Sequence, residues 1–472
     1  MKHLKSFLYV IVIGILLISC QDDLDDRIFP ADAKALNNFV WNAMNIFYLY
    51  NEDSPDLGDD RFASNQAYND FLEGFSQPED LFEHLKVNED RFSIIVSDFR
   101  VLENALSGIR VDNGMRFGLV GIDETNDVFG YIRYVVPNSP ADQVGLKRGM
   151  IFNRIDGQTF TTETNFNELF SPEVYTLGLA DFVEDELTSL DDEVQLIKIE
   201  ISENPIHYHD ILDFGSTQIG YLVMNNFRRN FDNQLNAVFG EFKAGGINEL
   251  VLDLRYNGGG DLRTAIDLAS MITGQFPNEL FINQIYNANF DNVSANFTTQ
   301  NRNEIGLNSL QLERLYVLTT SSSASASEVL ILGLQPYIDV VQIGTTTTGK
   351  FEGSTTLYDS PNFRRQDASI HHNYALQPII FSITNAIDEG GNSQGLVPQI
   401  QLSEEFRNIK AFGNLEETLL QQALIEIGVI SERKNKFKSK PYTAKILAED
   451  GQNNIDFQRM YIDLKDDSPY DQ

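Results

Sequence analysis

Short apolar runs alternate with amphipathic stretches through the second half of the chain. The apolar runs of strand length lie at 219–224, 249–254, 314–319 and 339–343. The stretches between them, whose apolar residues recur at helical intervals, lie at 232–244, 261–273 and 325–334. This alternation predicts an α/β core over residues 203–432, with functional loops at the strand ends.

The remaining parts of the chain have other patterns. Residues 31–104 predict helices, and the only tryptophan, Trp41, lies on an apolar stripe there. We interpret the stripe as a helical core face, with a substrate groove as the functional alternative. Residues 105–202 predict a small β-rich unit. Residues 433–472, rich in lysine and then in aspartate, predict a peripheral helix and tail.

Hydroxyl side chains cluster where the apolar run 315–319 passes into the helix predicted from Ser325. Small residues on both sides of Ser325 allow a sharp turn that exposes its hydroxyl, next to the free amides of a first helical turn. Lys350 follows in a loop rich in threonine and glycine. The combination predicts a serine nucleophile with a lysine base, and the alternative is an ordinary N-cap.

A lysine accepts a proton only as the free amine, and its unperturbed pKa is about 10.4, so a basic lysine must be desolvated. Glu328 and Asp339 are the only acidic residues between Ser325 and Lys350, and the strand-like run 340–344 suits burial. A neutral Lys350 would take the proton of Ser325 during attack and return it to the leaving amine.

Three motifs stand out: Ser-Ala-Ser-Ala-Ser-Glu at 323–328, Thr-Thr-Gly-Lys at 347–350 and Asp-Leu-Arg-Tyr-Asn-Gly-Gly-Gly at 253–260. Together they resemble those of the C-terminal processing peptidases, the tail-specific serine proteases of S41 type that pair a Ser/Lys dyad with a PDZ domain. The resemblance implies that Ser325 is the nucleophile and Lys350 the base. It also implies an oxyanion hole formed by the amides of Ala326 and of Gly259 or Gly260.

The sequence departs from the family pattern at three positions. Met150 and Gln399 stand where relatives usually carry aspartate. Ser354 stands where many relatives carry a glutamine that holds the base. We therefore expect backbone carbonyls or a water to orient Lys350, or else Glu352 from the same loop, although a carboxylate would favour the charged lysine.

The β-rich unit carries a second resemblance. Residues 116–121, Arg-Phe-Gly-Leu-Val-Gly, resemble the loop and first strand with which PDZ domains bind a peptide carboxylate, and 134–149 resemble the strand, helix start and turn that follow. The resemblance implies capture of a peptide by β-augmentation. The residues expected to bind substrate are Phe117, Gly118, Leu119 and Val120. The alternative is a small domain that only packs against the core.

The chain begins like a bacterial lipoprotein. Residues 1–19 have a basic start and an apolar stretch, followed by Cys20, the only cysteine. We expect Cys20 to be lipidated and to anchor the protein to the outer membrane, facing the periplasm or the cell surface. The alternative, a spanning helix, is weaker because the stretch is short. The acidic residues 20–30 are a solvated tether or resemble a surface-export signal.

The net charge of −34 argues against nucleic acid and anionic membrane surfaces as partners. His207 and His209 alternate in a strand-like run and could hold a metal, but no further ligand pattern accompanies them. We predict no metal and no cofactor.

The predicted fold is α/β: a crotonase- and ClpP-like protease core with an inserted PDZ domain and an N-terminal helical segment. The predicted function is a serine endopeptidase with a Ser/Lys dyad, which cleaves proteins or peptides recognised near their C-terminus in the cell envelope. The alternative is a non-catalytic lipoprotein that binds peptides or small molecules on the same fold. The pair of Ser325 and Lys350 argues against it, because a pure binder needs neither.

Overall fold

The computed structural model describes residues 35–123, 125–184, 186–406, 409–431 and 444–464. The predicted signal peptide, Cys20 and the acidic tether lie outside these residues. Two compact units divide the chain, residues 1–90 and 91–472. Within the described ranges no helix is long and apolar enough to cross a membrane.

The first unit is helical where it is described. Its helices are α2 (Ala35–Phe47), α3 (Asn65–Glu73) and α4 (Pro78–Leu85). Trp41 is buried, with its ring edge-on to Tyr68 at a centroid distance of 5.0 Å. Its indole Nε1 donates to the carbonyl of Asp56 at 2.8 Å, which satisfies the polar end of a buried tryptophan. The aromatic stripe is therefore a core face, as predicted.

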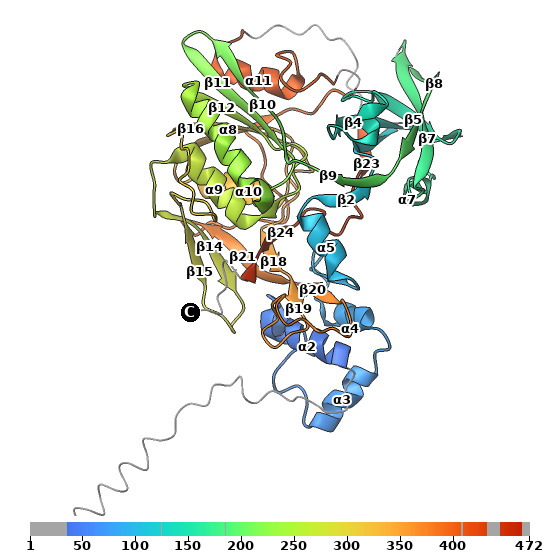
Figure 1. Ribbon diagram of the computed structural model, residues 1–472, viewed down its shortest axis with the longest axis vertical. Helices are drawn as coiled ribbons and strands as arrows, with labels where there is room; N and C mark the ends of the chain where they lie inside the picture. Colours follow the sequence, from blue (N-terminus) through green and yellow to red (C-terminus); the bar gives the residue numbers. More distant parts are fainter. Residues whose placement is uncertain (1–34, 124, 185, 407–408, 432–443, 465–472) are drawn as a thin grey trace, which may run out of the picture. The chain divides into compact units, whose positions relative to one another are not determined.

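The second unit is built on a six-stranded sheet in the order β10-β11-β12-β16-β17-β22 (Figure 1). Its strands are β10 (Ile206–Phe214), β11 (Thr217–Met224), β12 (Glu249–Asp253), β16 (Arg314–Thr319), β17 (Asp339–Gly344) and β22 (Ile400–Gln401). All neighbouring strands are parallel except the edge pair β10 and β11. The connecting helices are α8 (Asp232–Ala244), α9 (Leu262–Thr273) and α10 (Ala326–Leu334). The predicted alternation of strands and helices is confirmed.

A second six-stranded sheet lies beside the first and has the order β13-β24-β18-β21-β14-β15. Its strands are β13 (Gly260–Asp261), β24 (Met460–Ile462), β18 (Glu352–Thr355), β21 (Ile379–Asn385), β14 (Leu280–Tyr286) and β15 (Val293–Asn296). Strand β24 comes from the end of the chain, yet it pairs in parallel with both β13 and β18. The β13 and β18 loops that precede these pairings carry the Gly-rich and lysine motifs.

The β-rich region contains a sheet in the order β23-β3-β4-β5-β7-β8 (Figure 1). Its strands are β23 (Ala444–Glu449), β3 (Met115–Ile122), β4 (Val128–Val135), β5 (Ile151–Ile155), β7 (Val174–Val183) and β8 (Glu186–Ile197), with the short helix α6 (Pro140–Gln143) following β4. Side chains of Phe117, Phe152 and Phe160 fill its core. Strand β3 would be an edge of this sheet without β23.

The described residues of the C-terminal region differ from the expected peripheral helix and tail. Residues 444–464 form two strands, β23 and β24, in two different sheets. The reason is that each strand pairs with strands far away in sequence: β23 adds to the edge of its sheet at β3, and β24 lies between β13 and β18. Composition around residue 450 carries no information about such long-range pairing.

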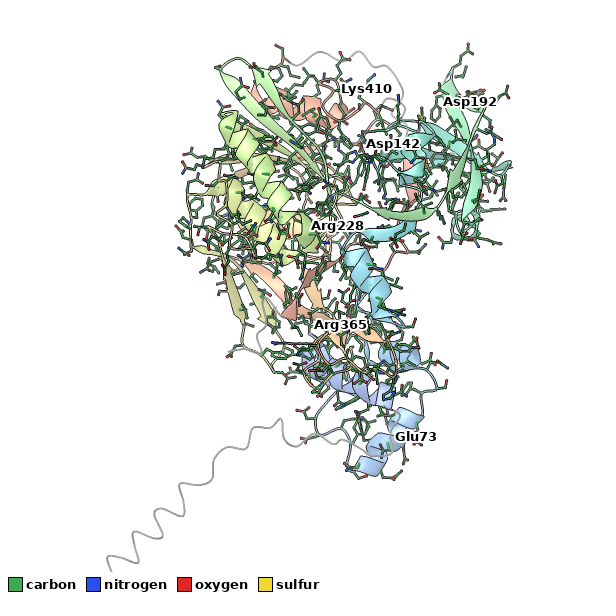
Figure 2. All side chains as sticks on the ribbon, viewed as in Figure 1. Glu73, Asp142, Asp192, Arg228, Arg365 and Lys410 are labelled. Atoms are coloured by element: carbon green, nitrogen blue, oxygen red, sulfur yellow. The ribbon has the colours of Figure 1, made fainter. Side chains whose placement is uncertain are left out.

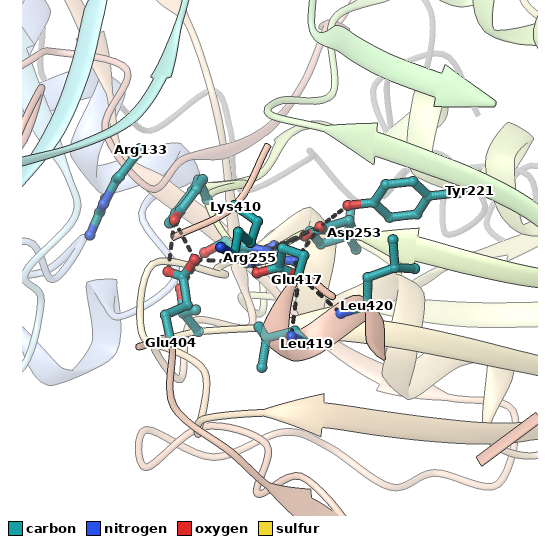
Figure 3. Close-up of polar contacts among 12 residues, drawn as sticks. Arg133, Tyr221, Asp253, Arg255, Glu404, Lys410, Glu417, Leu419 and Leu420 are labelled. Atoms are coloured by element: carbon teal, nitrogen blue, oxygen red, sulfur yellow. Dashed lines mark hydrogen bonds and ion pairs between the residues drawn. The ribbon is translucent and has the colours of Figure 1, made fainter. Parts of the chain in front are cut away.

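A fully buried ion cluster anchors the loop after β12 (Figure 3). The guanidinium of Arg255 donates to Asp253 at 2.7 Å, to Glu417 at 2.6 Å and 2.9 Å, and to Glu404 at 3.0 Å. Burial opposes the charge on Glu404, but Arg148 and Arg255 outweigh it and lower its pKa to about 2. Glu417 also accepts from two amides at the start of helix α11 (Thr418–Ile427).

Replacing Arg255 with methionine should lower the free energy of unfolding by about 3–5 kcal/mol, because buried Asp253 would lose its guanidinium partner and Glu404 and Glu417 would keep only Arg148. Urea denaturation of the purified chain measures this loss. Arg314→Met is the matched control, since the Arg314–Asp339 pair is about half exposed on both sides. The control should change stability by about 1 kcal/mol or less. Equal effects of the two substitutions would contradict the anchoring role.

Candidate functional site

Ser325 occupies a sharp turn between β16 and α10. Its backbone has φ +59° and ψ −117°, a region that few residues other than glycine adopt and that costs about 1–3 kcal/mol. An ordinary N-cap residue has β-region dihedrals instead. Ser325 is the N-cap residue of α10 and forms a capping box with Glu328, but its dihedrals are not those of an ordinary N-cap. The predicted strand-to-helix turn is present.

The neighbouring hydroxyls have structural partners. Ser323 donates to the carbonyl of Leu254 at 2.8 Å, and Ser327 donates to the carbonyl of Asn257 at 3.0 Å. Both bonds tie the turn to the loop after β12. Ser325 donates instead to the carbonyl of Gln458 at 3.0 Å. Of the three serines in the motif, Ser325 alone makes its side-chain bond toward the C-terminal segment.

The glycine-rich turn packs directly against Ser325. Gly259 has φ +107°, and a Cβ atom there would lie 2.6 Å from the Cβ of Ser325, so a larger residue cannot be accommodated. The amide of Gly259 donates to the side chain of Asn257 at 2.9 Å. Gly260, with φ +137°, starts β13. Ala326 is the first residue of α10, where an amide has no acceptor within the helix.

Lys350 lies in the loop between β17 and β18 and is buried. Its Nζ donates to the carbonyl oxygen of Gln458 at 3.0 Å, the same oxygen that Ser325 contacts. The Nζ also lies 4.3 Å from the ring centroid of Phe92. The structure thus brings the two side chains of the predicted dyad to one acceptor atom.

Two further residues of the lysine loop were singled out in the sequence. Burial raises the pKa of Glu352, while the charge of Lys350 acts in the opposite direction. Ser354 donates to the carbonyl of Met460 at 3.0 Å. A backbone carbonyl does hold Lys350, which is one of the expected arrangements, but the carbonyl belongs to the C-terminal segment.

Glu328 connects the turn of Ser325 to the lysine loop. It is fully buried, and its Oε2 accepts from the amides of Ser325 at 2.8 Å and Lys350 at 2.9 Å. Its Oε1 accepts from the amide of Gly349 at 2.7 Å and from the hydroxyl of Thr347. Burial raises the pKa of Glu328, and these four hydrogen bonds act against that shift. The sequence interpretation missed this role, although Ser-x-x-Glu spacing signals a capping box.

The two histidines of β10 do not converge on a site. His207 packs against the rings of Tyr134 and Phe412, and burial lowers its pKa to about 4. His209 lies 3.2 Å from a carboxylate oxygen of Glu241. In the part of the chain that the structure describes, no group of three histidine, cysteine, aspartate or glutamate side chains could hold a metal ion.

The predicted substrate-binding residues Phe117, Gly118, Leu119 and Val120 all lie on β3. They pair with an extended segment of the same chain, since Gly118 lies opposite Glu449, Leu119 opposite Ala448 and Val120 opposite Ile446. The amide of Asp450 donates to the carbonyl of Phe117 at 2.9 Å. The β3 edge therefore binds an antiparallel strand.

Residues 218–363, which hold Ser325, Lys350 and the glycine-rich turn, match the model of peptidase family S41, and residues 35–94 match the peptidase S41 N-terminal domain. The chain thus has one region similar to the S41 peptidase domain and one similar to the S41 N-terminal domain. A putative S41 protease from Bacteroides fragilis is similar in structure, with a TM-score of 0.66 and 27% identity over 83% of this chain and 97% of that one. The expected α/β fold class is thereby confirmed.

Two curated proteins are similar to this chain in sequence. Carboxyl-terminal-processing peptidase 2 of Arabidopsis thaliana chloroplasts is 24% identical over 53% of this chain and 48% of the relative. The carboxyl-terminal-processing protease of Picosynechococcus is 24% identical over 46% of this chain and 49% of the relative. The chain spans about half the length of these relatives.

Glu328→Gln should lower the free energy of unfolding by about 2 kcal/mol. The substitution replaces one buried carboxylate oxygen, which accepts hydrogen bonds, with an amide NH₂ group that faces the same donors. Denaturant unfolding measures the change. Glu389→Gln, on the exposed turn after β21, is the control and should stay within about 0.5 kcal/mol of the unmodified chain. A stable Glu328→Gln chain would show that the hub is dispensable.

Proposed function

We propose that the protein is a serine endopeptidase in which Ser325 is the nucleophile and Lys350 the general base. The observation that carries the proposal is the strained turn of Ser325, whose hydroxyl meets the buried amine of Lys350 at one carbonyl oxygen. Such strain persists only where the surroundings enforce it, and it is concentrated at functional sites. A protein that only bound peptides would need neither group.

The proposed reaction follows acyl transfer. Lys350, as the free amine, takes the proton of Ser325 while the oxygen attacks the substrate carbonyl carbon. The tetrahedral intermediate collapses as the lysine returns that proton to the leaving amine, and the peptide bond breaks. A water then attacks the acyl-enzyme, with Lys350 accepting its proton and passing one to the departing serine oxygen.

The proposed oxyanion hole consists of the amide of Ala326 and of Gly259 or Gly260. Ala326 is the stronger candidate for the first donor, because an amide at the start of a helix points outward and lacks an internal acceptor. The amide of Gly259 donates to Asn257 in this structure. To serve as a donor, the Gly259 amide would have to exchange Asn257 for the developing oxyanion. The other candidate, Gly260, is the first residue of β13.

The β-rich region is proposed to be a PDZ domain inserted before a crotonase- and ClpP-like core. Support comes from the edge of β3, which accepts an antiparallel strand at Phe117 to Val120. Added strands of this kind are how such domains bind extended peptides. The substrates proposed are proteins or peptides recognised near their C-terminus, delivered from this edge toward Ser325.

The proposed location is the outer membrane, facing the periplasm or the cell surface, through lipid on Cys20. The support is the sequence of residues 1–20 alone.

Ser325→Ala should lower kcat by about 10⁴-fold, since no other group can form the acyl-enzyme. Ser323→Ala and Ser327→Ala should each keep measurable turnover and lose about 1 kcal/mol of stability, the worth of one hydrogen bond to a backbone carbonyl. Cleavage of a fluorescein-labelled unfolded protein measures turnover. An active Ser325→Ala chain beside an inactive Ser323→Ala chain would reassign the nucleophile.

Lys350→Arg should be as inactive as Lys350→Met, because arginine keeps its proton at every workable pH and cannot serve as base. The same cleavage assay measures both variants, with circular dichroism as the check on folding. Lys243→Arg, on the exposed end of α8, is the control and should retain full activity. Turnover by the Lys350→Arg chain would rule out the general-base role.

A further inference from the structure

One stretch of the described chain, residues 444–464, lies against both the β3 edge and the pair of Ser325 and Lys350. Strand β23 pairs with β3, residues 451–458 turn, and β24 then inserts between β13 and β18. Figure 1 shows β23 beside β4 in the β-rich region and β24 beside β18 in the other sheet. The segment 444–464 therefore contacts both the proposed peptide-binding strand and the proposed dyad.

The contact at the cleft is not that of a cleavable bond. The carbonyl oxygen of Gln458 accepts from both Ser325 and Lys350 at 3.0 Å, so it ties up the nucleophile and the base together. A scissile carbonyl would instead direct its oxygen toward the amide of Ala326. Gln458 also has φ +50°, so the chain bends there and does not lie extended across the nucleophile.

The acidic residues of the segment lie beside basic residues of the surface that it contacts, which we call the track. Each of four acidic residues faces an arginine: Glu449 with Arg133, Asp450 with Arg116, Asp456 with Arg110, and Asp463 with Arg229. The pair at Asp456 is 2.7 Å long, and Arg228, labelled in Figure 2, lies 3.7 Å from the same carboxylate. Arg116 also pairs with Asp112 and Glu203, and Arg229 with Asp261, so the surrounding fold holds these two arginines in place. In a chain with 69 acidic and 35 basic residues, a row of arginines favours an acidic peptide beside it.

We propose that residues 444–464 are a built-in competitive inhibitor, which holds the β3 edge and caps Ser325 and Lys350 until an acidic substrate end displaces β23. The inference rests on the proposed function, because it concerns the regulation of the same site. Displacement at β3 would release the segment that carries Gln458, so binding at one end of the track opens the other.

The first experiment uses the full chain with Glu449→Arg. The carboxylate of Glu449 accepts from Arg133 and from Ser322, and an arginine there would repel Arg133. With fluorescein-labelled casein as substrate, the apparent KM should fall at least about tenfold while kcat stays unchanged. This is the result expected when a competitive inhibitor held by a buried charge pair is weakened. Asp192→Arg makes the same charge change on β8, away from the track (Figure 2), and should have no effect.

A charge swap tests the pairing itself. Arg133→Glu combined with Glu449→Arg should return the KM to that of the unmodified chain, because the ion pair is restored with reversed sign. Thermal unfolding accompanies each variant. A fully folded Glu449→Arg chain with unchanged KM, or a lower kcat without change in KM, would overturn the proposal and leave β23 and β24 as structural strands.

A second experiment tests the proposal even if the Glu449→Arg chain does not fold. A recognition site for a specific protease is inserted between residues 432 and 443, and the folded chain is cut there. Activity of the cut chain should rise on dilution and fall again when a synthetic peptide of residues 444–464 is added, whereas a scrambled peptide should do nothing. Activity that is independent of dilution and of the peptide would overturn the proposal.

Binding of the labelled 444–464 peptide to the cut Ser325→Ala chain separates this inference from the proposed function. Fluorescence anisotropy reports occupancy of the track without turnover. If the peptide binds saturably but the chain with Ser325 intact cleaves no substrate, the binding of segment 444–464 is supported and the peptidase proposal is refuted. Cleavage by the uncut chain without any peptide binding would refute self-inhibition and leave the peptidase standing.

Discussion

The carboxylate of Glu328 is the constraint on which the site depends. A single oxygen accepts from the amides of both Ser325 and Lys350, so the turn after β16 and the loop after β17 cannot move apart independently. The carboxylate is fully buried, and leaving its donors without an acceptor would cost several hydrogen bonds at once. The positive φ of Ser325 is sustained by this tie and by the bonds of Ser323 and Ser327 to the neighbouring loop.

The loop that receives those bonds has its own anchor. Arg255 fixes the start of the glycine-rich turn by neutralising carboxylates from β12 and from two later segments, Glu404 and Glu417. A buried cation with this many partners permits one arrangement of the backbone around it. The three motifs of the sequence are therefore connected. The ion cluster of Arg255 fixes the start of the glycine-rich turn, and hydrogen bonds of Ser323 and Ser327 tie the serine turn to that loop. Glu328 then joins the serine turn to the lysine loop.

Local patterns in the sequence predicted the main strands and helices of the α/β core. Strands such as 249–254 and 314–319 are apolar and short, helices between them have clear periodicity, and the structure contains both with boundaries shifted by at most a residue or two. Ser325 and Lys350 could be found because turn chemistry requires small residues on either side of an exposed hydroxyl. Contacts across long sequence separations could not, and so Gln458, Glu404 and Glu417 were absent from the predicted site.

Strand β24 comes later in the sequence than the other strands of its sheet, yet it lies between β13 and β18. The parallel strands from β11 to β17 pair with one another without any strand from the C-terminal region. In the second sheet β18, β21, β14 and β15 also pair among themselves, whereas β13 is joined to β18 only through β24. The link between the glycine-rich turn at β13 and the lysine loop before β18 thus depends on a strand distant from both in sequence, and pairings of this kind are the slow ones in folding.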